Sequence, residues 1–227
     1  MNIVSFVVRN KNRLICLWAD FFFVFFQKPF YSFCFNSKGN RFDCKGKMRN
    51  SHVLVEGHGN TILIGNKSLL NKVDIAVSGY NNQLIIHDNV NFLEGGRIRI
   101  EDGNNIVEIA DRTMLINCFF SVADTNTRLI VGQDCLFSAG VVIRTSDSHS
   151  ILNSSVERIN SGGDVIIGNH VWVGYDATIL KGSTIGDNSI VGTKSVVSVQ
   201  KIEQNVVAVG NPCRTVKYGV NWTEKRI

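Results

Sequence analysis

An apolar residue recurs every six positions near the C-terminal end of this 227-residue chain. This spacing fits neither an α-helix, with 3.6 residues per turn, nor an extended strand with a period of two. It predicts a triangular solenoid, in which three sides of six residues, each a short strand and a corner, make a coil of 18. The apolar positions are Ile167, Val173, Ile179, Ile185, Val191 and Val197, and smaller residues follow at Val171, Ala177, Ser183, Ser189 and Ser195.

The same phase appears upstream at Val131, Phe137 and Ile143, and the 24 residues from Ile143 to Ile167 are four times six. The phase therefore survives the intervening segment. Farther upstream, similar segments begin at intervals of 22 or 23 residues, and we expect coils with four or five extra residues at one corner. The Asn residues would supply left-handed or capped turns there. These segments start at Asn60, Asn82, Asn105 and Thr127.

Composition supports an all-β fold, because Ile and Val together number 50 against 13 Leu, and β-branched residues favour strands. The period is lost from Ile202 onward, so the coils are expected to end near residues 198–201. Three segments follow: 1–49, 50–201 with a loop at 144–164, and a C-terminal tail at 202–227. Segment 1–49 holds ten of the 14 Phe. It is either a cap on the solenoid or a membrane-contact segment, since its apolar run 14–26 is too short for a spanning helix.

The net charge of +5 is mild and diffuse, and it does not indicate a nucleic-acid partner. The six Cys contain no CxxC pair, which argues against a zinc ribbon or a redox motif. Scattered cysteines of this kind are typical of reduced thiols. We therefore expect a cytoplasmic protein, with peripheral membrane contact through the N-terminus as the alternative.

Four segments together resemble the hexapeptide-repeat acyltransferases, and most closely the branch that O-acetylates bacterial surface polysaccharides, including sialic-acid capsules. They are 141–151, 164–174, 179–186 and 206–216, the last reading Val-Val-Ala-Val-Gly-Asn-Pro-Cys-Arg-Thr-Val. The resemblance covers residues 131–217 well and 50–130 only as generic coils. It implies a left-handed parallel β-helix and a homotrimer with active sites between subunits. It also implies acetyl-CoA as co-substrate, a polysaccharide acceptor and no metal.

The resemblance places the catalytic histidine of the family at His149, in the polar stretch that interrupts the repeat. Acetyl transfer from a thioester to a hydroxyl needs a base, and imidazole titrates near neutrality. Asp147 would orient that ring, unless it is a turn aspartate and a backbone carbonyl orients the ring instead. Trp172 should point outward because Val171 and Val173 point inward. It would then contact the cofactor, pack between subunits, or do both.

Binding of coenzyme A would require a surface that the pantetheine arm can approach closely and cationic side chains for its phosphates. Gly174 would let the pantetheine arm come near, and Tyr175 would line the same groove. Lys194, Arg214 and Lys217 would bind phosphate oxygens, the alternative being solvated surface charge. At the loop, Arg144 and Arg158 would bind the carboxylate of a sialic-acid acceptor.

The predicted function is O-acetylation of a hydroxyl on a bacterial surface polysaccharide, with a sialic-acid capsule as one such acceptor. Two alternatives stay open. One is an acetyltransferase for a small acceptor such as a free sugar or an antibiotic, and the other is a non-enzymatic carbohydrate-binding solenoid. A zinc enzyme on the same fold is disfavoured because the five His residues include no pair four or five positions apart.

Overall fold

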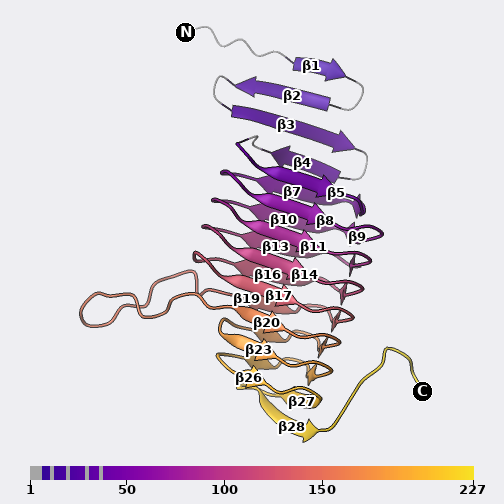
Figure 1. Ribbon diagram of the computed structural model, residues 1–227, viewed down its shortest axis with the longest axis vertical. Helices are drawn as coiled ribbons and strands as arrows, with labels where there is room; N and C mark the ends of the chain where they lie inside the picture. Colours follow the sequence, from indigo (N-terminus) through magenta and orange to yellow (C-terminus); the bar gives the residue numbers. More distant parts are fainter. Residues whose placement is uncertain (1–6, 11–12, 19–20, 29–30, 36–37) are drawn as a thin grey trace.

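The computed structural model describes residues 38–227 with their side chains, and the backbone of the N-terminal strands at 7–10, 13–18, 21–28 and 31–35. The coils from residue 41 onward stack along the long axis of the molecule (Figure 1). Each coil passes in turn through three parallel sheets, which we call face 1, face 2 and face 3. Among the described residues, no helix has the length and apolarity needed to cross a membrane.

Face 1 combines an antiparallel N-terminal segment with a parallel ladder. The N-terminal strands are β1 (Val7–Asn10), β2 (Arg13–Trp18), β3 (Phe21–Lys28) and β4 (Tyr31–Phe35). The ladder continues through β7 (Ser51–Val55), β10 (Val73–Val77), β13 (Gly96–Ile100), β16 (Cys118–Val122), β19 (Val142–Arg144), β22 (Thr178–Ile179) and β25 (Val196–Val197).

Face 2 is parallel throughout, and face 3 is parallel until its last strand reverses. Face 2 contains β5 (Arg41–Cys44), β8 (Thr61–Ile64), β11 (Gln83–Ile86), β14 (Ile106–Ile109), β17 (Arg128–Val131), β20 (Val165–Ile167), β23 (Ser183–Ile185) and β26 (Lys201–Ile202). Face 3 contains β6 (Lys47–Arg49), β9 (Leu69–Asn71), β12 (Asn91–Phe92), β15 (Met114–Leu115), β18 (Leu136–Phe137), β21 (Trp172–Val173), β24 (Ile190–Val191), β27 (Val206–Val209) and β28 (Arg214–Tyr218).

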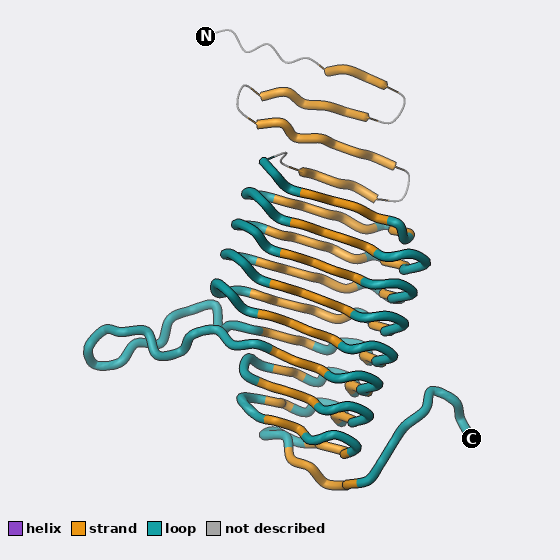
Figure 2. The backbone as a smooth tube through the Cα atoms, viewed as in Figure 1, coloured by secondary structure: helices purple, strands orange, loops and turns teal. Residues whose placement is uncertain are grey.

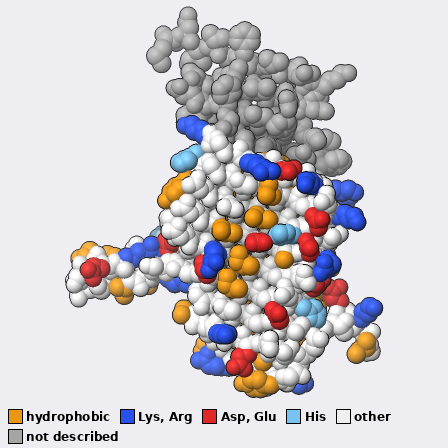
Figure 3. All heavy atoms as spheres, viewed as in Figure 1, with side chains coloured by type: hydrophobic (Ala, Val, Ile, Leu, Met, Phe, Trp, Pro, Cys, Tyr) orange, Lys and Arg blue, Asp and Glu red, His pale blue; other side chains and the backbone are white. Residues whose placement is uncertain are grey.

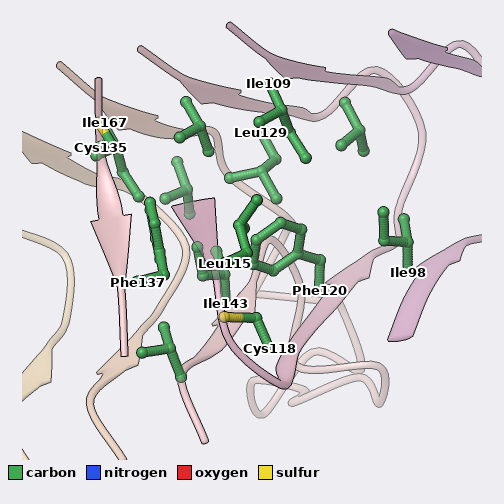
Figure 4. Close-up of a cluster of buried hydrophobic side chains, with 14 of the residues drawn as sticks. Ile98, Ile109, Leu115, Cys118, Phe120, Leu129, Cys135, Phe137, Ile143 and Ile167 are labelled. Atoms are coloured by element: carbon green, nitrogen blue, oxygen red, sulfur yellow. The ribbon is translucent and has the colours of Figure 1, made fainter. Parts of the chain in front are cut away.

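The interior is filled by the inward-facing residues of successive coils. Phe120 and Ile143 point into the prism from face 1, Ile167 from face 2 and Phe137 from face 3 (Figure 4), and each is at most 1% exposed. Three parallel ladders joined by short corners are the architecture of a left-handed β-helix. The prediction of an all-β hexapeptide solenoid is therefore confirmed.

The upstream coils carry their extra residues at one corner, as predicted, between face 1 and face 2: aligned residues are nine apart from Ile98 to Val107 and four apart from Ile179 to Ser183. Part of this surplus extends the face 1 strands into the corner, with five residues in β10 against two in β22. The left-handed conformations belong to Asn81 and Asn104, with φ of 53° and 55°. Asn82 and Asn105, the next residues, are fully buried and use their side chains to join successive coils.

The ladders also continue past the expected end at residues 198–201, because β26 pairs with β23 and β27 with β24 in parallel. The inward residues Val197 and Ile202 are five positions apart instead of six, and Ala208 then follows after six. A corner shortened by one residue shifts the phase, so the period is lost in the sequence while backbone pairing persists.

Burial in the prism raises the pKa of the Cys118 and Cys135 thiols to about 12. Such thiols stay protonated and unreactive at neutral pH. The prediction that segment 1–49 caps the solenoid or touches a membrane concerns side chains that lie largely outside the described residues, and it stays a prediction.

Candidate functional site

The loop that carries His149 leaves the corner between face 1 and face 2, where β19 ends and β20 begins. It forms an arm that projects away from the stacked coils (Figure 2). A bridge between Leu152 and Arg158 closes its outer part. His149 is exposed at the base of this arm, where a solvent-borne acceptor has access to its ring.

Three polar residues hold the base of the arm. The Lys181 ammonium, one coil farther on, donates to the Asp147 carboxylate at 2.5 Å and to the Asn160 carbonyl at 2.8 Å. The Asn160 amide donates both to Asp147 and to the His149 backbone carbonyl, each at 2.8 Å. Hydrogen bonds from Lys181 and Asn160 lower the pKa of Asp147. The Asp147 carboxylate is thus tied to the His149 backbone through Asn160.

Lys181 and Asn160 were missed by the sequence analysis. Lys181 lies 34 residues from Asp147, and Asn160 lies 13 residues from it. Their contacts depend on the stacking of coils and on the fold of the arm, neither of which a local motif reveals. One feature of the sequence does indicate Lys181. Counting coils from the repeat places the Lys181–Gly182 corner one coil after the loop, on the same edge of the solenoid.

The two arginines predicted to bind an acceptor carboxylate have different surroundings. Arg158 makes a two-pronged ion pair with Asp124, at 2.9 and 2.7 Å, which lowers the pKa of Asp124. Arg144, at the end of β19, donates to the Ser148 hydroxyl at 2.7 Å, next to His149. Arg158 therefore anchors the arm to the preceding coil, while Arg144 is bonded to Ser148, the residue before His149.

Trp172 points outward from β21 on face 3, as predicted, and is 37% exposed. Its indole N–H donates to the Ser138 hydroxyl at 3.3 Å. Ser138 follows β18 at the corner between face 3 and face 1. The indole therefore leans toward that corner.

The predicted cofactor residues Gly174, Tyr175 and Lys194 lie at this same corner between face 3 and face 1. A Cβ at Gly174 would meet the Thr193 backbone nitrogen at 2.6 Å, so coil stacking alone requires glycine there. Tyr175 is 51% exposed, and the Lys194 ammonium pairs with the Asp176 carboxylate at 3.1 Å.

Arg214 and Lys217 are exposed on β28, after the cis Asn211–Pro212 bond that follows the last coil. Together with Lys194 they place three cations on the C-terminal part of the molecule. This arrangement is compatible with the predicted contact to coenzyme phosphates.

One chain does not bring His149 and Trp172 together. In a three-sided coil, the corner between face 1 and face 2 is opposite face 3, so the two side chains lie on different sides of the solenoid. A site that contains both therefore needs residues from two copies. Among the described residues, no group of three or more His, Cys, Asp and Glu could hold a metal ion.

An aromatic residue of the tail was also missed. The Trp222 ring stacks on the His170 imidazole, with centroids 4.4 Å apart and planes 12° apart, and its centroid lies 6.0 Å from that of Trp172. No sequence pattern indicates this contact, since it spans 52 residues and follows the end of the repeat.

Comparison with known proteins identifies the class. The family model described as bacterial transferase hexapeptide (six repeats) matches residues 164–198. The crystal structure of the polysialic acid O-acetyltransferase OatWY is similar over 83% of this chain and 90% of that chain, with a TM-score of 0.75 and 30% identity. That of the polySia-specific acetyltransferase NeuO covers 87% and 91%, with a TM-score of 0.77 and 29% identity. The chain belongs to the bacterial hexapeptide-repeat transferases, which confirms the resemblance.

Curated relatives align over shorter stretches. The galactoside O-acetyltransferase of Escherichia coli (strain K12) is 45% identical over 53 residues, which are 23% of this chain and 26% of that protein. The polysialic acid O-acetyltransferase of Neisseria meningitidis is 77% identical over 26 residues, 12% of each chain. The matched stretch is thus about a quarter or less of the length of these relatives.

Proposed function

We propose that this protein transfers an acetyl group from acetyl-CoA to a hydroxyl of a sialic-acid polysaccharide, with His149 as the general base. The observation that carries the proposal is similarity along more than four-fifths of the chain to two structures of polysialic acid O-acetyltransferases. An exposed histidine on a loop whose base is fixed by Lys181 and Asn160 fits that chemistry.

In the proposed reaction, a ring nitrogen of His149 removes the proton of the acceptor hydroxyl while its oxygen attacks the thioester carbonyl carbon. Backbone N–H groups would stabilise the tetrahedral oxyanion. The carbon–sulfur bond then breaks, and the proton held by His149 passes to the departing thiolate. The products are the acetylated sugar and coenzyme A.

Asp147 acts in this proposal as a positioning residue. Its carboxylate accepts hydrogen bonds from the Lys181 ammonium and the Asn160 amide. The same Asn160 amide donates to the His149 backbone carbonyl. In this proposal Asp147 positions the His149 imidazole indirectly, by fixing the loop backbone through Asn160. It does not bond the imidazole directly. Arg144, beside Ser148, would bind the acceptor carboxylate.

The working unit in this proposal is a homotrimer. His149 of one copy and Trp172 of the next would face a shared cleft. The acyl donor would lie along Gly174, Tyr175 and Lys194, with Arg214 and Lys217 near its phosphates. The exposed aliphatic side chains of the arm suit contact with a neighbouring copy: Ile151, Leu152, Val156 and Ile159 are 50–74% exposed. Hydrophobic, acidic and basic side chains all lie along this projecting arm (Figure 3).

The test is acetyl-CoA consumption by the full-length protein with polysialic acid, other capsule sugars, free monosaccharides and chloramphenicol-type acceptors. We expect turnover with polysialic acid, and a loss of at least about 100-fold in kcat for His149→Ala, in the range of general-base catalysis. His58→Ala, far from the loop, is the matched control and should keep full activity. Turnover only with small acceptors would show that the acceptor is a small molecule and not a polysaccharide. No turnover with any acceptor would favour the non-enzymatic carbohydrate-binding solenoid.

A further inference from the structure

The C-terminal tail turns back along the coils after β28. The Val220 N–H donates to the Asn205 carbonyl at 3.0 Å, and the Trp222 indole N–H donates to the His170 carbonyl at 2.7 Å. Both acceptors lie at the corner between face 2 and face 3, two coils apart. The end of the chain runs outside the stack in this region (Figure 1).

The tail follows a row of corner residues that are already joined to one another. His170, Asn188 and Asn205 occupy the left-handed position of three successive coils, with φ of 53°, 58° and 58°. The His170 ring nitrogen Nδ1 lies 3.1 Å from the Asn188 oxygen, and the Asn188 amide donates to Asn205 at 3.0 Å. The His170 ring on which Trp222 stacks is therefore itself held in place.

Trp222 also flanks Trp172. The two indole planes are inclined at 44° with centroids 6.0 Å apart, a separation typical of interacting aromatic pairs. On its other side, Trp172 donates to Ser138 at the corner between face 3 and face 1. Trp172 is thus bracketed by the tail on one side and by Ser138 on the other, and the chain continues directly from it to Gly174 and Tyr175.

We infer that Trp222 is a positioning residue of the acyl-donor site, which holds the Trp172 indole against the corner where the thioester arm binds. This inference rests on the proposed function and extends it to the tail. An indole with one side occupied by Trp222 loses rotamer freedom before the ligand arrives, so less entropy is lost on binding. The effect should therefore fall on acyl-donor affinity.

The experiment compares Trp222→Ala, Trp222→Phe and Tyr218→Ala in the full-length protein. Tyr218 is a matched control, being an aromatic of the same C-terminal region that is 67% exposed on β28. Calorimetry gives the dissociation constant of coenzyme A, and steady-state kinetics give KM for acetyl-CoA and kcat separately. Light scattering and thermal melting report assembly and folding.

For Trp222→Ala we expect a rise of roughly three- to tenfold in the coenzyme A dissociation constant and in KM for acetyl-CoA, as loss of one aromatic contact implies. The value of kcat should change less than twofold. Trp222→Phe keeps a ring on His170 and should recover part of the loss, and Tyr218→Ala should match the parent.

Parent-like KM and dissociation constant in a folded Trp222→Ala protein would overturn the inference and leave the proposed function intact. A fall in kcat at unchanged KM would also overturn it, since that result places Trp222 in the chemical step. If the parent itself neither binds coenzyme A nor consumes acetyl-CoA, both the function and the inference fail.

Discussion

The solenoid has two parts of different width. The upstream coils, in residues 51–144, repeat every 22 or 23 residues, and aromatic and Leu side chains such as Phe92, Phe120 and Leu129 fill them. The downstream coils, in residues 165–209, repeat after 18 residues, or 17 in the last coil, and bury only small or β-branched residues, such as Val173, Ala177 and Ile179. A longer coil encloses a wider prism, which needs bulkier side chains to reach the density of a protein interior.

The candidate site lies where the width changes. The arm with His149 is inserted after the last wide coil, and Trp172 belongs to the first narrow one. A buried ladder of corner side chains ends at the same point, since Asn105 accepts from Thr127, which in turn contacts Thr145 at the root of the arm. The wide part therefore acts as a scaffold, and the step in width leaves a corner from which the loop with His149 emerges.

The largest loss of stability should come from removing a large buried side chain from the wide part of the prism. Phe120→Ala removes a fully buried ring that packs edge-on against Phe137, and should lower the free energy of unfolding by about 3–5 kcal/mol. Val191→Ala in the narrow part removes less volume and should cost about 1–2 kcal/mol on the same reasoning. Denaturant titration of both variants measures the contrast, and equal losses would refute the difference in width.

The buried ladder should matter next. Asn105→Ala leaves the Thr127 N–H without its acceptor and the Glu101 carbonyl without its donor, so we expect a loss of about 1–3 kcal/mol. The control is Asn91→Ala: the half-buried Asn91 side chain donates to the nearby Asn89 carbonyl, and its loss should cost less than about 0.5 kcal/mol. Equal stability of the two variants would show that the ladder adds nothing.

Removing the Lys181 side chain should raise amide exchange in the arm more than in the coils. Lys181→Ala removes three hydrogen bonds at the arm base, and amide exchange in residues 147–161 should speed up while the coils stay protected. The ion pair holds the pKa of Asp147 below its ordinary value. Its contribution is complete above that ordinary value, near 3.8, and is lost as pH falls through the lower folded pKa.

The difference in arm exchange between Lys181→Ala and the parent should therefore be constant from pH 8 to about pH 5 and shrink only in stronger acid. Exchange corrected for its intrinsic pH dependence checks this. A difference that vanishes near neutrality would mean that the ion pair does not hold the arm.

Residues inside the strict repeat are predictable from the sequence, whereas contacts made outside the repeat are not. A strict period, as at Val173 or Ile179, predicts inward residues and the outward Trp172, because stacking forces the same geometry on each coil. Contacts such as Asp147–Lys181 and Trp222–His170 join positions 34 and 52 residues apart. They depend on the path of an arm and a tail outside the repeat, and no periodicity governs that path.

The smallest effect should come from the ion pair that bridges the two parts at the surface. Arg128 in the last wide coil binds Asp164 at the start of the first narrow one, at 2.6 Å, and the two side chains are 55% and 32% exposed. Pairs of this kind are screened by solvent and salt, so Arg128→Ala should shift the melting temperature by less than about 2 °C. Parallel melts at low and high salt check this, and the already small difference should fall further as salt rises. A larger shift in melting temperature that persists at high salt would contradict this prediction. It would mean that the Arg128–Asp164 ion pair, and not coil stacking alone, holds the wide and narrow parts together.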